Sequence, residues 1–244
     1  NMDKPYQGTG HLGIAPVILY GQLIDMSLNN GLGKVIEKNV IIHQDTFGRG
    51  NIKATYHANG TDWWMIVPKS HSNCYWMFLI TKDGIQDPFL ECEGEVWLDR
   101  DQLGQAVFSP DGRWYARLHG SNYFQLYEFD NETGDLFNSM LIDLPDMQST
   151  RPGVAISPNS RFMYANTRQK VYQFDLEATD IPESRILIAE YDGYHNIGAT
   201  TFNMQALAPD NKIYISSPTS TYHLHVIHKP DCLGEQSQLE QHAI

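Results

Sequence analysis

The sequence predicts an all-β fold, and within it a β-propeller of four-stranded blades. Three observations predict it: a signature that recurs four times, strand-like alternation after each occurrence, and no long segment with the 3.6-residue period of a helix. The signature occupies residues 57–67, 108–116, 156–165 and 207–216. Aligning Ala58 with Pro110, Pro158 and Pro209 gives spacings of 52, 48 and 51 residues. A period of about 50 residues with strand patterning is typical of propeller blades.

Each repeat presents its elements in the same order. A first strand ends in an apolar residue, a small residue and usually Pro. Asp or Asn followed by Gly, Asn or Ser then makes a tight turn, because these residues accept a positive φ or cap the turn with a side-chain oxygen. An alternating aromatic strand follows. Third strands are predicted at residues 123–130, 171–176 and 224–227, and the turn at 130–135 precedes an outermost strand.

The chain holds about five blades in one domain, residues 1–244. We assign a partial blade to residues 18–49 and further blades to residues 50–100, 101–148, 149–197 and 198–244. Seven blades of this size would need about 350 residues. The chain therefore forms a five-bladed ring or part of a larger one, and we expect a fragment of a seven-bladed ring.

Composition excludes several classes of protein. Of the 244 residues, 41% are hydrophobic and 11% aromatic, which is enough for a packed core. Lys and Arg number 17 against 29 Asp and Glu, so the net charge is 17 − 29 = −12. A chain this acidic is repelled by phosphate backbones, so we expect no nucleic-acid partner. No apolar run approaches the ~20 residues of a membrane helix, so we expect no membrane span.

The three cysteines are too few for a disulfide scaffold and lack the spacing of a metal site. Cys74 and Cys92 lie nine residues on either side of Asp83, at the centre of a predicted hairpin. A symmetric hairpin would set the two cysteines opposite each other, near disulfide reach. A register shift at Pro88 would instead leave two unpaired thiols, so both states remain open.

Several segments resemble one family of propellers. These are Ile24–Val35 (IDMSLNNGLGKV), His57–Trp64 (HANGTDWW), Leu207–Tyr214 (LAPDNKIY) and Val226–Cys232 (VIHKPDC). In this order they resemble the secreted Bacteroidota propellers, YVTN/WD-repeat-like, that precede PKD-type domains and a C-terminal type IX secretion signal. The resemblance runs from about residue 18 to 232. The resemblance implies seven blades, export and a place at the cell surface. It does not imply a chemical reaction.

Aromatic residues in predicted loops are the candidate ligand contacts. Side chains alternate along a strand, so one ring of each aromatic pair, such as Trp63-Trp64, faces inward and packs between blades. Trp97, Tyr123 and Tyr194 lie in predicted loops and are the better candidates for ligand binding.

Histidines are the candidate metal ligands. His223 and His225 alternate to one strand face, but no third ligand is evident, and ordinary surface histidines explain them as well. Asp111, Asn159 and Asp210 recur at one blade position, which turn chemistry alone predicts. We therefore expect no metal and no cofactor, and no catalytic residue is assigned.

Two classes of function remain. The first is a non-catalytic, extracellular binding or structural module that contacts protein or glycan partners through its faces and loops. Exposed blade edges would then be covered by an assembly or by more of the same polypeptide. The alternative is a propeller enzyme, lactonase- or glycan-lyase-like, with His and Asp residues in its channel. A cluster of three or more such groups at one channel mouth would favour the enzyme.

Overall fold

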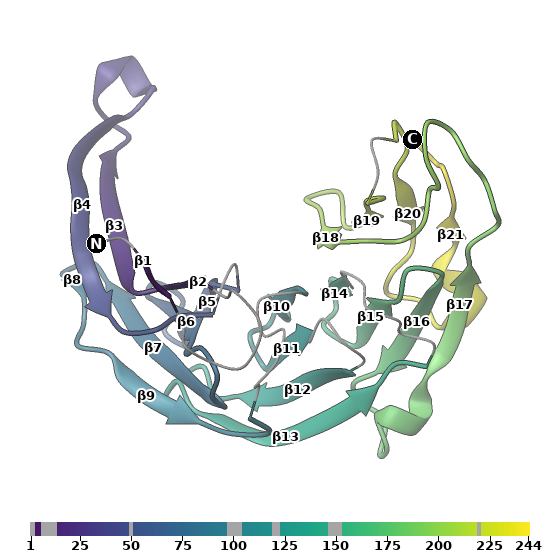
Figure 1. The fold of residues 1–244 in the computed structure, drawn as a ribbon, viewed down its shortest axis with the longest axis horizontal. Helices are drawn as coiled ribbons and strands as arrows, with labels where there is room; N and C mark the ends of the chain where they lie inside the picture. Colours follow the sequence, from purple (N-terminus) through teal and green to yellow (C-terminus); the bar gives the residue numbers. More distant parts are fainter. Residues whose placement is uncertain are drawn as a thin grey trace.

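A computed structural model describes residues 3–5, 14–48, 51–96, 104–118, 123–145, 153–218 and 221–244. In these residues the chain is built almost entirely of antiparallel β-sheets, placed side by side in an open arc (Figure 1). Three short 3₁₀ turns are the only helical elements described: η1 (Asn29–Gly31), η2 (Pro182–Ser184) and η3 (Gly234–Ser237). Within the described residues, no helix has the length and apolar character needed to cross a membrane.

Four sheets have at least four strands and two have only two. The first large sheet holds β5 (Lys53–Tyr56), β6 (Trp63–Pro68), β7 (Cys74–Thr81), β8 (Gly84–Ile85) and β9 (Phe89–Cys92). The second holds β10 (Ala106–Phe108), β11 (Trp114–Leu118), β12 (Tyr123–Phe129) and β13 (Leu136–Asp143). The third holds β14 (Val154–Ile156), β15 (Phe162–Asn166), β16 (Lys170–Asp175) and β17 (Ile186–Glu190). The fourth holds β18 (Gln205–Leu207), β19 (Ile213–Ile215), β20 (His225–Ile227) and β21 (Leu239–Glu240). The two-stranded sheets are β3 (Ile18–Asp25) with β4 (Lys34–Gln44), and β1 (Asp3–Pro5) with β2 (Ile14–Pro16).

The sheets are propeller blades, so the predicted fold is confirmed. In the four-stranded sheets the strands follow one another in chain order, and in the five-stranded sheet both β8 and β9 pair with β7. The first strand of each large sheet lies on the concave side of the arc (Figure 1). Successive innermost strands contact each other, from β5 to β10, β14 and β18. We number the blades in chain order: blade 1 is β3–β4, and blades 2 to 5 begin with those four innermost strands. Blade 1 has two strands where blades 3, 4 and 5 have four.

The repeated turns form as the sequence predicts. In blade 3, Oδ1 of Asp111 accepts from the Ser109 hydroxyl at 2.6 Å and from the Arg113 amide at 3.1 Å. In blade 4, Asn159 makes the same two hydrogen bonds, with Ser157 at 2.6 Å and with the Arg161 amide at 3.1 Å. The recurring Asp and Asn are therefore turn caps.

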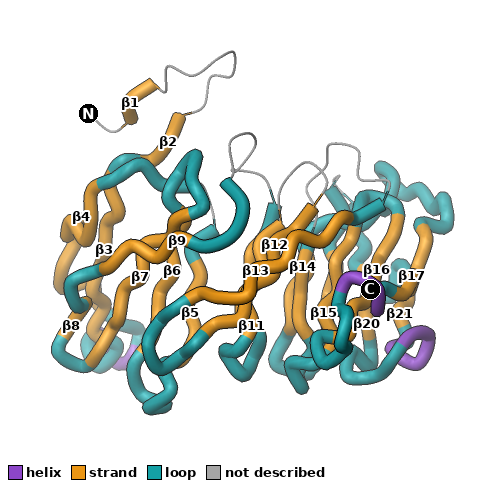
Figure 2. The backbone as a smooth tube through the Cα atoms, turned by 90° about the horizontal axis from the view of Figure 1, so that it is seen from below, coloured by secondary structure: helices purple, strands orange, loops and turns teal. Residues whose placement is uncertain are grey.

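The strands run between two edges of the arc (Figure 2). In an antiparallel blade, the turn between the first two strands and the turn between the last two lie at one edge, here called the turn edge. The loop between the second and third strands and the link to the next blade lie at the opposite edge, the loop edge.

The core lies between the blades. Alternate residues of each strand point to the preceding and to the following blade, as the strand period requires. Between blades 2 and 3, the hydroxyls of Tyr75 and Tyr127 lie 2.6 Å apart, and both rings are buried. The Arg117 guanidinium is buried beside them, 5.7 Å from the Tyr75 ring centroid. Burial opposes its charge, but interactions with Tyr75 and Tyr115 raise the pKa of Arg117 above its usual value.

The hairpin of blade 2 carries a disulfide. Cys74 of β7 and Cys92 of β9 are direct register partners, with Cα atoms 4.0 Å apart, and their sulfurs are bonded. The register is therefore that of the symmetric hairpin, with Pro88 in the link before β9. Cys232 is a free thiol.

Candidate functional site

A cluster of rings and one carboxylate lies at the loop edge where blades 4 and 5 meet. We call it the loop-edge cluster: Asp192, Tyr194, His223, His225 and His242. The Tyr194 and His242 ring centroids lie 4.4 Å apart, and those of Tyr194 and His223 lie 5.5 Å apart. Three candidates from the sequence, Tyr194, His223 and His225, therefore come together around His242.

The backbone holds the Tyr194 ring in place. The carbonyl of Tyr194 accepts from the Tyr191 hydroxyl at 2.5 Å, and from the hydroxyl and amide of Thr200 at 3.1 and 3.3 Å. Its amide donates to Oδ1 of Asp192 at 2.9 Å, which closes a side-chain turn. The ring itself remains 44% exposed. These hydrogen bonds hold the loop in one conformation and leave the aromatic surface open. Ligand binding therefore costs little conformational entropy.

Asp192 and His242 join the two blades. Nε2 of His242 lies 2.8 Å from Oδ2 of Asp192, and the Asp192 side chain is 43% exposed. Burial disfavours the charged form of the Asp192 carboxylate. Its hydrogen bonds with the Tyr194 amide and His242 nevertheless hold the pKa of Asp192 below its usual value. Asp192 therefore carries its charge at neutral pH and offers acceptor oxygens beside the Tyr194 ring.

His225 lies beneath the exposed rings and is fully buried. Its ring lies 4.8 Å from Phe202 and 5.3 Å from His242, and Nε2 is 3.3 Å from the Ser217 hydroxyl. Burial, aided by His242, lowers the pKa of His225 to about 4. His225 is therefore a neutral packing residue at neutral pH.

The exposed groups of the loop-edge cluster are suited to contacts with a polar ligand. Over the described ranges, no group of three or more His, Cys, Asp or Glu side chains is placed to hold a metal ion. The exposed groups are instead an aromatic face, a carboxylate and imidazoles. A ring face attracts polarised C–H groups, and the carboxylate accepts from hydroxyls, so the surface suits a sugar.

The other two sequence candidates lie elsewhere. Tyr123 begins β12, where its ring is half-buried and its pKa is raised by burial and by Glu95. It therefore lies in a strand on the blade 2 side of blade 3. Trp97 lies outside the described residues. Neither joins the loop-edge cluster.

Sequence reasoning missed Asp192 and His242. The two residues are 50 positions apart, which is one blade period. Neighbouring blades place equivalent loops side by side, so pairing residues one period apart would have found them.

The innermost strands carry a second polar group, made of amides. Nε2 of Gln205 donates to Oδ1 of Asn166 at 2.7 Å, and the side chain of Gln105 binds the backbone of both β14 and β18. At the equivalent position of blade 2, Lys53 begins β5, and burial lowers its pKa. Side-chain amides thus link the inner strands of blades 3 to 5, and those of Asn166 and Gln205 are buried.

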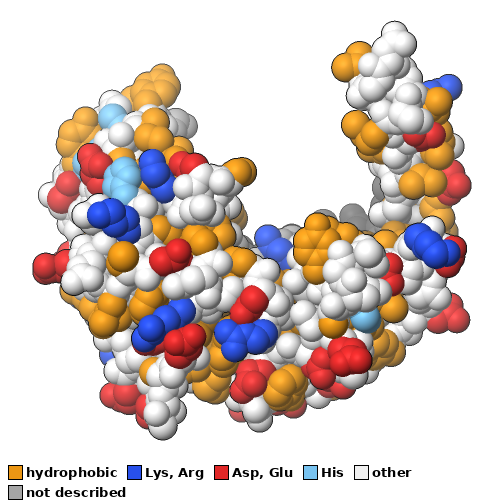
Figure 3. Space-filling model, turned by 180° about the vertical axis from the view of Figure 1, so that it is seen from behind, with side chains coloured by type: hydrophobic (Ala, Val, Ile, Leu, Met, Phe, Trp, Pro, Cys, Tyr) orange, Lys and Arg blue, Asp and Glu red, His pale blue; other side chains and the backbone are white. Residues whose placement is uncertain are grey.

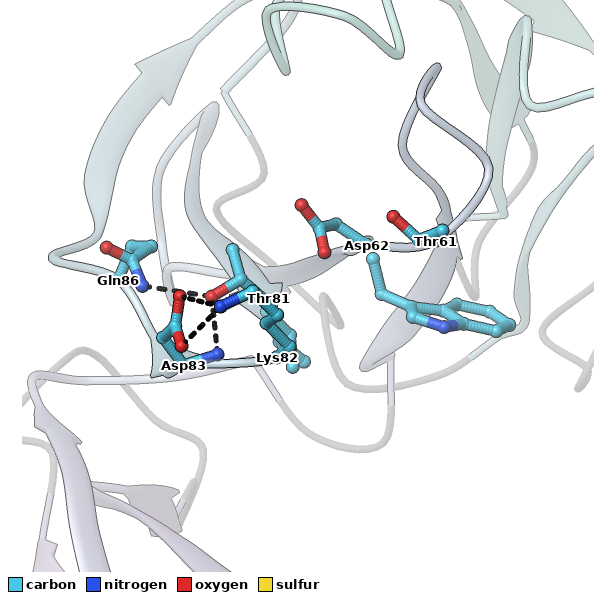
Figure 4. A pocket seen from close by; sticks show the side chains of 8 residues that line it. Thr61, Asp62, Thr81, Lys82, Asp83 and Gln86 are labelled. Carbon is cyan, nitrogen blue, oxygen red and sulfur yellow. Dashed lines mark hydrogen bonds and ion pairs between the residues drawn. The ribbon is translucent and has the colours of Figure 1, made fainter.

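A shallow pocket of about 780 Å³ lies at the turn edge of blade 2. Figure 4 shows Thr61 and Asp62 on one side and Thr81, Lys82, Asp83 and Gln86 on the other. Trp63 and Ile80 complete the lining. Both side-chain oxygens of Asp83 accept from Lys82 at 2.8 Å, and Gln86 donates to the Thr81 hydroxyl.

Charge is dispersed over the outer surface. Figure 3 shows acidic side chains scattered over the back of the arc, with single Lys and Arg side chains among them. Several Lys and Arg side chains of the described residues are paired, as in Arg161 with Asp175 at 2.8 Å and Arg113 with Asp111 at 2.6 Å.

The fold and its blade-to-blade packing define the chain as a β-propeller. Among solved structures it is similar to a candidate 6-phosphogluconolactonase from Bacteroides uniformis, with a TM-score of 0.59 and 12% identity over 94% of this chain. A candidate 6-phosphogluconolactonase from Bacteroides fragilis gives 0.54 and 12% over 93%. The Dos1 propeller gives 0.54 and 12% over 87%.

The chain spans about two thirds of the length of the two Bacteroides proteins, 66% and 65%, and 53% of the Dos1 propeller. At this identity the likeness concerns the fold alone. No protein-family model matches the sequence, and no curated protein matches it.

Proposed function

We propose that the chain is a binding module that takes a neutral glycan at the loop-edge cluster. The observation that carries the proposal is the convergence of Tyr194, His223 and Asp192 from two loops onto one exposed surface. The Tyr194 ring is the stacking platform. Asp192 accepts from sugar hydroxyls, and His223, whose ring centroid lies 5.5 Å from that of Tyr194, borders the platform.

Titration with neutral oligosaccharides ending in galactose, mannose or N-acetylglucosamine tests the proposal. We expect saturable binding of one class, weakened at least 10-fold by Tyr194→Ala because the platform is lost. Tyr20→Ala is the matched control, since Tyr20 is 48% exposed on β3 and should leave affinity unchanged. Binding of none of these sugars, or equal binding by Tyr194→Ala, would contradict the proposal.

We further propose that the module works outside the cell, as the resemblance to secreted propellers implies. The Cys74–Cys92 bond supports this, because disulfides persist in oxidising compartments. In the protein isolated from its source without reductant, denaturing thiol labelling should modify Cys232 alone. Labelling of all three cysteines would contradict the proposal.

An enzyme acting on a lactone is the second candidate. Two structural neighbours carry that name, and Lys53 begins the innermost strand of blade 2 with a lowered pKa. A lysine with a lowered pKa can act as a base. Release of acid from 6-phosphogluconolactone faster than the spontaneous rate, and lost in Lys53→Met, would favour this function over a purely binding one.

A further inference from the structure

At two of the three interfaces between blades 2 to 5, neighbouring blades interlock at the turn edge in the same way. Between blades 3 and 4 the Asp111 amide instead donates at 3.1 Å to the Ser160 hydroxyl, in the first turn of blade 4. The amide of Ala58, in the first turn of blade 2, donates at 2.9 Å to the carbonyl of Asn131, in the last turn of blade 3. The amide of Asn159, in the first turn of blade 4, donates at 2.9 Å to Oδ1 of Asp231, in the last turn of blade 5. In each case the first turn of one blade rests on the last turn of the next.

Blade 2 presents the receiving half of such a contact. Its last turn contains Lys82 and Asp83, and Asp83 lies two residues after β7 as Asn131 lies two residues after β12. Among the described residues, blade 1, which should supply the first turn, consists of β3 and β4 only. These strands lead directly into β5, as the outer pair of each later blade leads into the next, so blade 1 lacks the inner pair. The pocket of Figure 4 lies where the missing turn would rest.

Burial of the inner strands shows the same gap. Tyr56 and Trp63 are register partners on β5 and β6, as Phe108 and Tyr115 are on β10 and β11. Tyr56 and Trp63 are 52% and 37% exposed, whereas Phe108 and Tyr115 are 9% and 0% exposed. The preceding blade covers the pair in blade 3 but leaves the pair in blade 2 open.

We propose that a β-hairpin of the same polypeptide, outside residues 1–244, docks in this gap and completes blade 1. One strand pairs with the free edge of β3, one face covers Tyr56 and Trp63, and the connecting turn enters the pocket. By analogy with Ala58 and Asn159, an amide of that turn donates to an oxygen of the Lys82–Asp83 turn. The hairpin has alternating apolar residues and an Asp- or Asn-capped turn, like those of blades 3 and 4.

The choice of this occupant rests on strand order. In every large sheet the second strand is joined along the chain to the third. The strands β1 and β2, which directly precede β3, pair with each other. A partner for β3 that continues this order therefore precedes them in the same polypeptide. A second copy of the chain does not fit, because its inner hairpins are already built into blades of their own.

Hydroxyl-radical footprinting tests the proposal. The protein isolated from its source is compared with a chain of residues 1–244, with intact mass and sedimentation measured for both. We expect oxidation of Tyr56 and Trp63 to fall at least fivefold in the natural protein, which should also be heavier than the shorter chain. Tyr222, 78% exposed, and Trp64, 4% exposed, are the controls and should oxidise equally in both.

Equal oxidation of Trp63 in the two proteins would overturn the proposal. Protection of Trp63 in a natural protein no heavier than the 244-residue chain would also overturn it. In that case, sedimentation as a dimer identifies a second copy as the occupant, and co-sedimentation with another protein identifies a separate partner. The test is independent of the glycan proposal, because Tyr194 lies at the opposite edge.

Discussion

The side-chain amide of Gln105 donates to the carbonyl oxygen of Gln205 at 2.5 Å, across 100 residues of sequence. Oε1 of the same side chain accepts from the amides of Gln205 at 3.0 Å and Val154 at 3.3 Å. One glutamine of blade 3 thus occupies backbone groups of the innermost strands of blades 4 and 5. Separate sheets share no backbone hydrogen bonds, and the side-chain hydrogen bonds of Gln105 join them instead.

Replacing Gln105 should therefore destabilise three blades together. Gln105→Ala leaves the Gln205 and Val154 backbone groups without these partners, and we expect a loss of about 2–3 kcal/mol. Urea unfolding followed by tryptophan fluorescence measures it. Gln236→Ala, at an exposed position in η3, should change stability by less than about 0.5 kcal/mol. Equal effects in the two variants would contradict the role of Gln105.

Gly153 should not tolerate a methyl group. A Cβ there would lie 2.3 Å from the Asn203 carbonyl oxygen and 2.9 Å from Oδ1 of Asn166. The nearest of these atoms is backbone, so we expect Gly153→Ala to cost at least ~2 kcal/mol through overpacking. Gly31→Ala is the comparison, since that site is open and only its positive φ of 84° opposes a side chain. That variant should lose about 1 kcal/mol, and a smaller loss for Gly153→Ala would contradict the steric argument.

The Cys74–Cys92 bond should stabilise the outer hairpin of blade 2. It closes a loop with a sequence separation of 18, so Cys92→Ser should cost about 3 kcal/mol. Cys232→Ser should stay within ~0.5 kcal/mol, since that thiol is free. Reductant should weaken the wild-type protein and leave Cys92→Ser unchanged in thermal unfolding. Sensitivity of that variant to reductant would point to another cause.

His225 should make stability depend on pH in mild acid. Burial, then His242, lowers its folded pKa from 6.5 to about 4, so the unfolded chain binds the proton more tightly. Its contribution is complete above pH ~6.5 and is lost as the pH falls toward 4, by up to about 3 kcal/mol. His225→Gln should flatten the stability curve in that range. Thermal unfolding at pH 4 to 7 measures this effect, and an unchanged slope in His225→Gln would contradict the assignment.

The sequence predicted what is local or periodic. The caps at Asp111 and Asn159 act within five residues, so composition and spacing were sufficient to place them. The Cys74–Cys92 register follows from the symmetry of one hairpin. The blade order follows from a repeat near 50 residues, because each repeat forms one blade and consecutive blades pack side by side.

Contacts between residues of different blades could not be predicted from the sequence in this way. Asp192 meets His242 after 50 residues, and Gln105 meets Gln205 after 100, because the arc brings equivalent positions of blades together. Polar residues in loops carry no signal of their partner unless they are compared one or two periods apart. The exposure of Trp63 also depends on what covers blade 2, which its own sequence does not encode.

The interlocking turns also determine when contacts between blades can form during synthesis. The Asn159 amide finds its acceptor in Asp231, 72 residues later in the chain. At roughly 5–20 residues per second, a ribosome needs about 4–14 s to make that stretch. The first turns of blades 2 and 4 thus stay without these hydrogen-bond partners until the outer hairpin of the following blade has been synthesised.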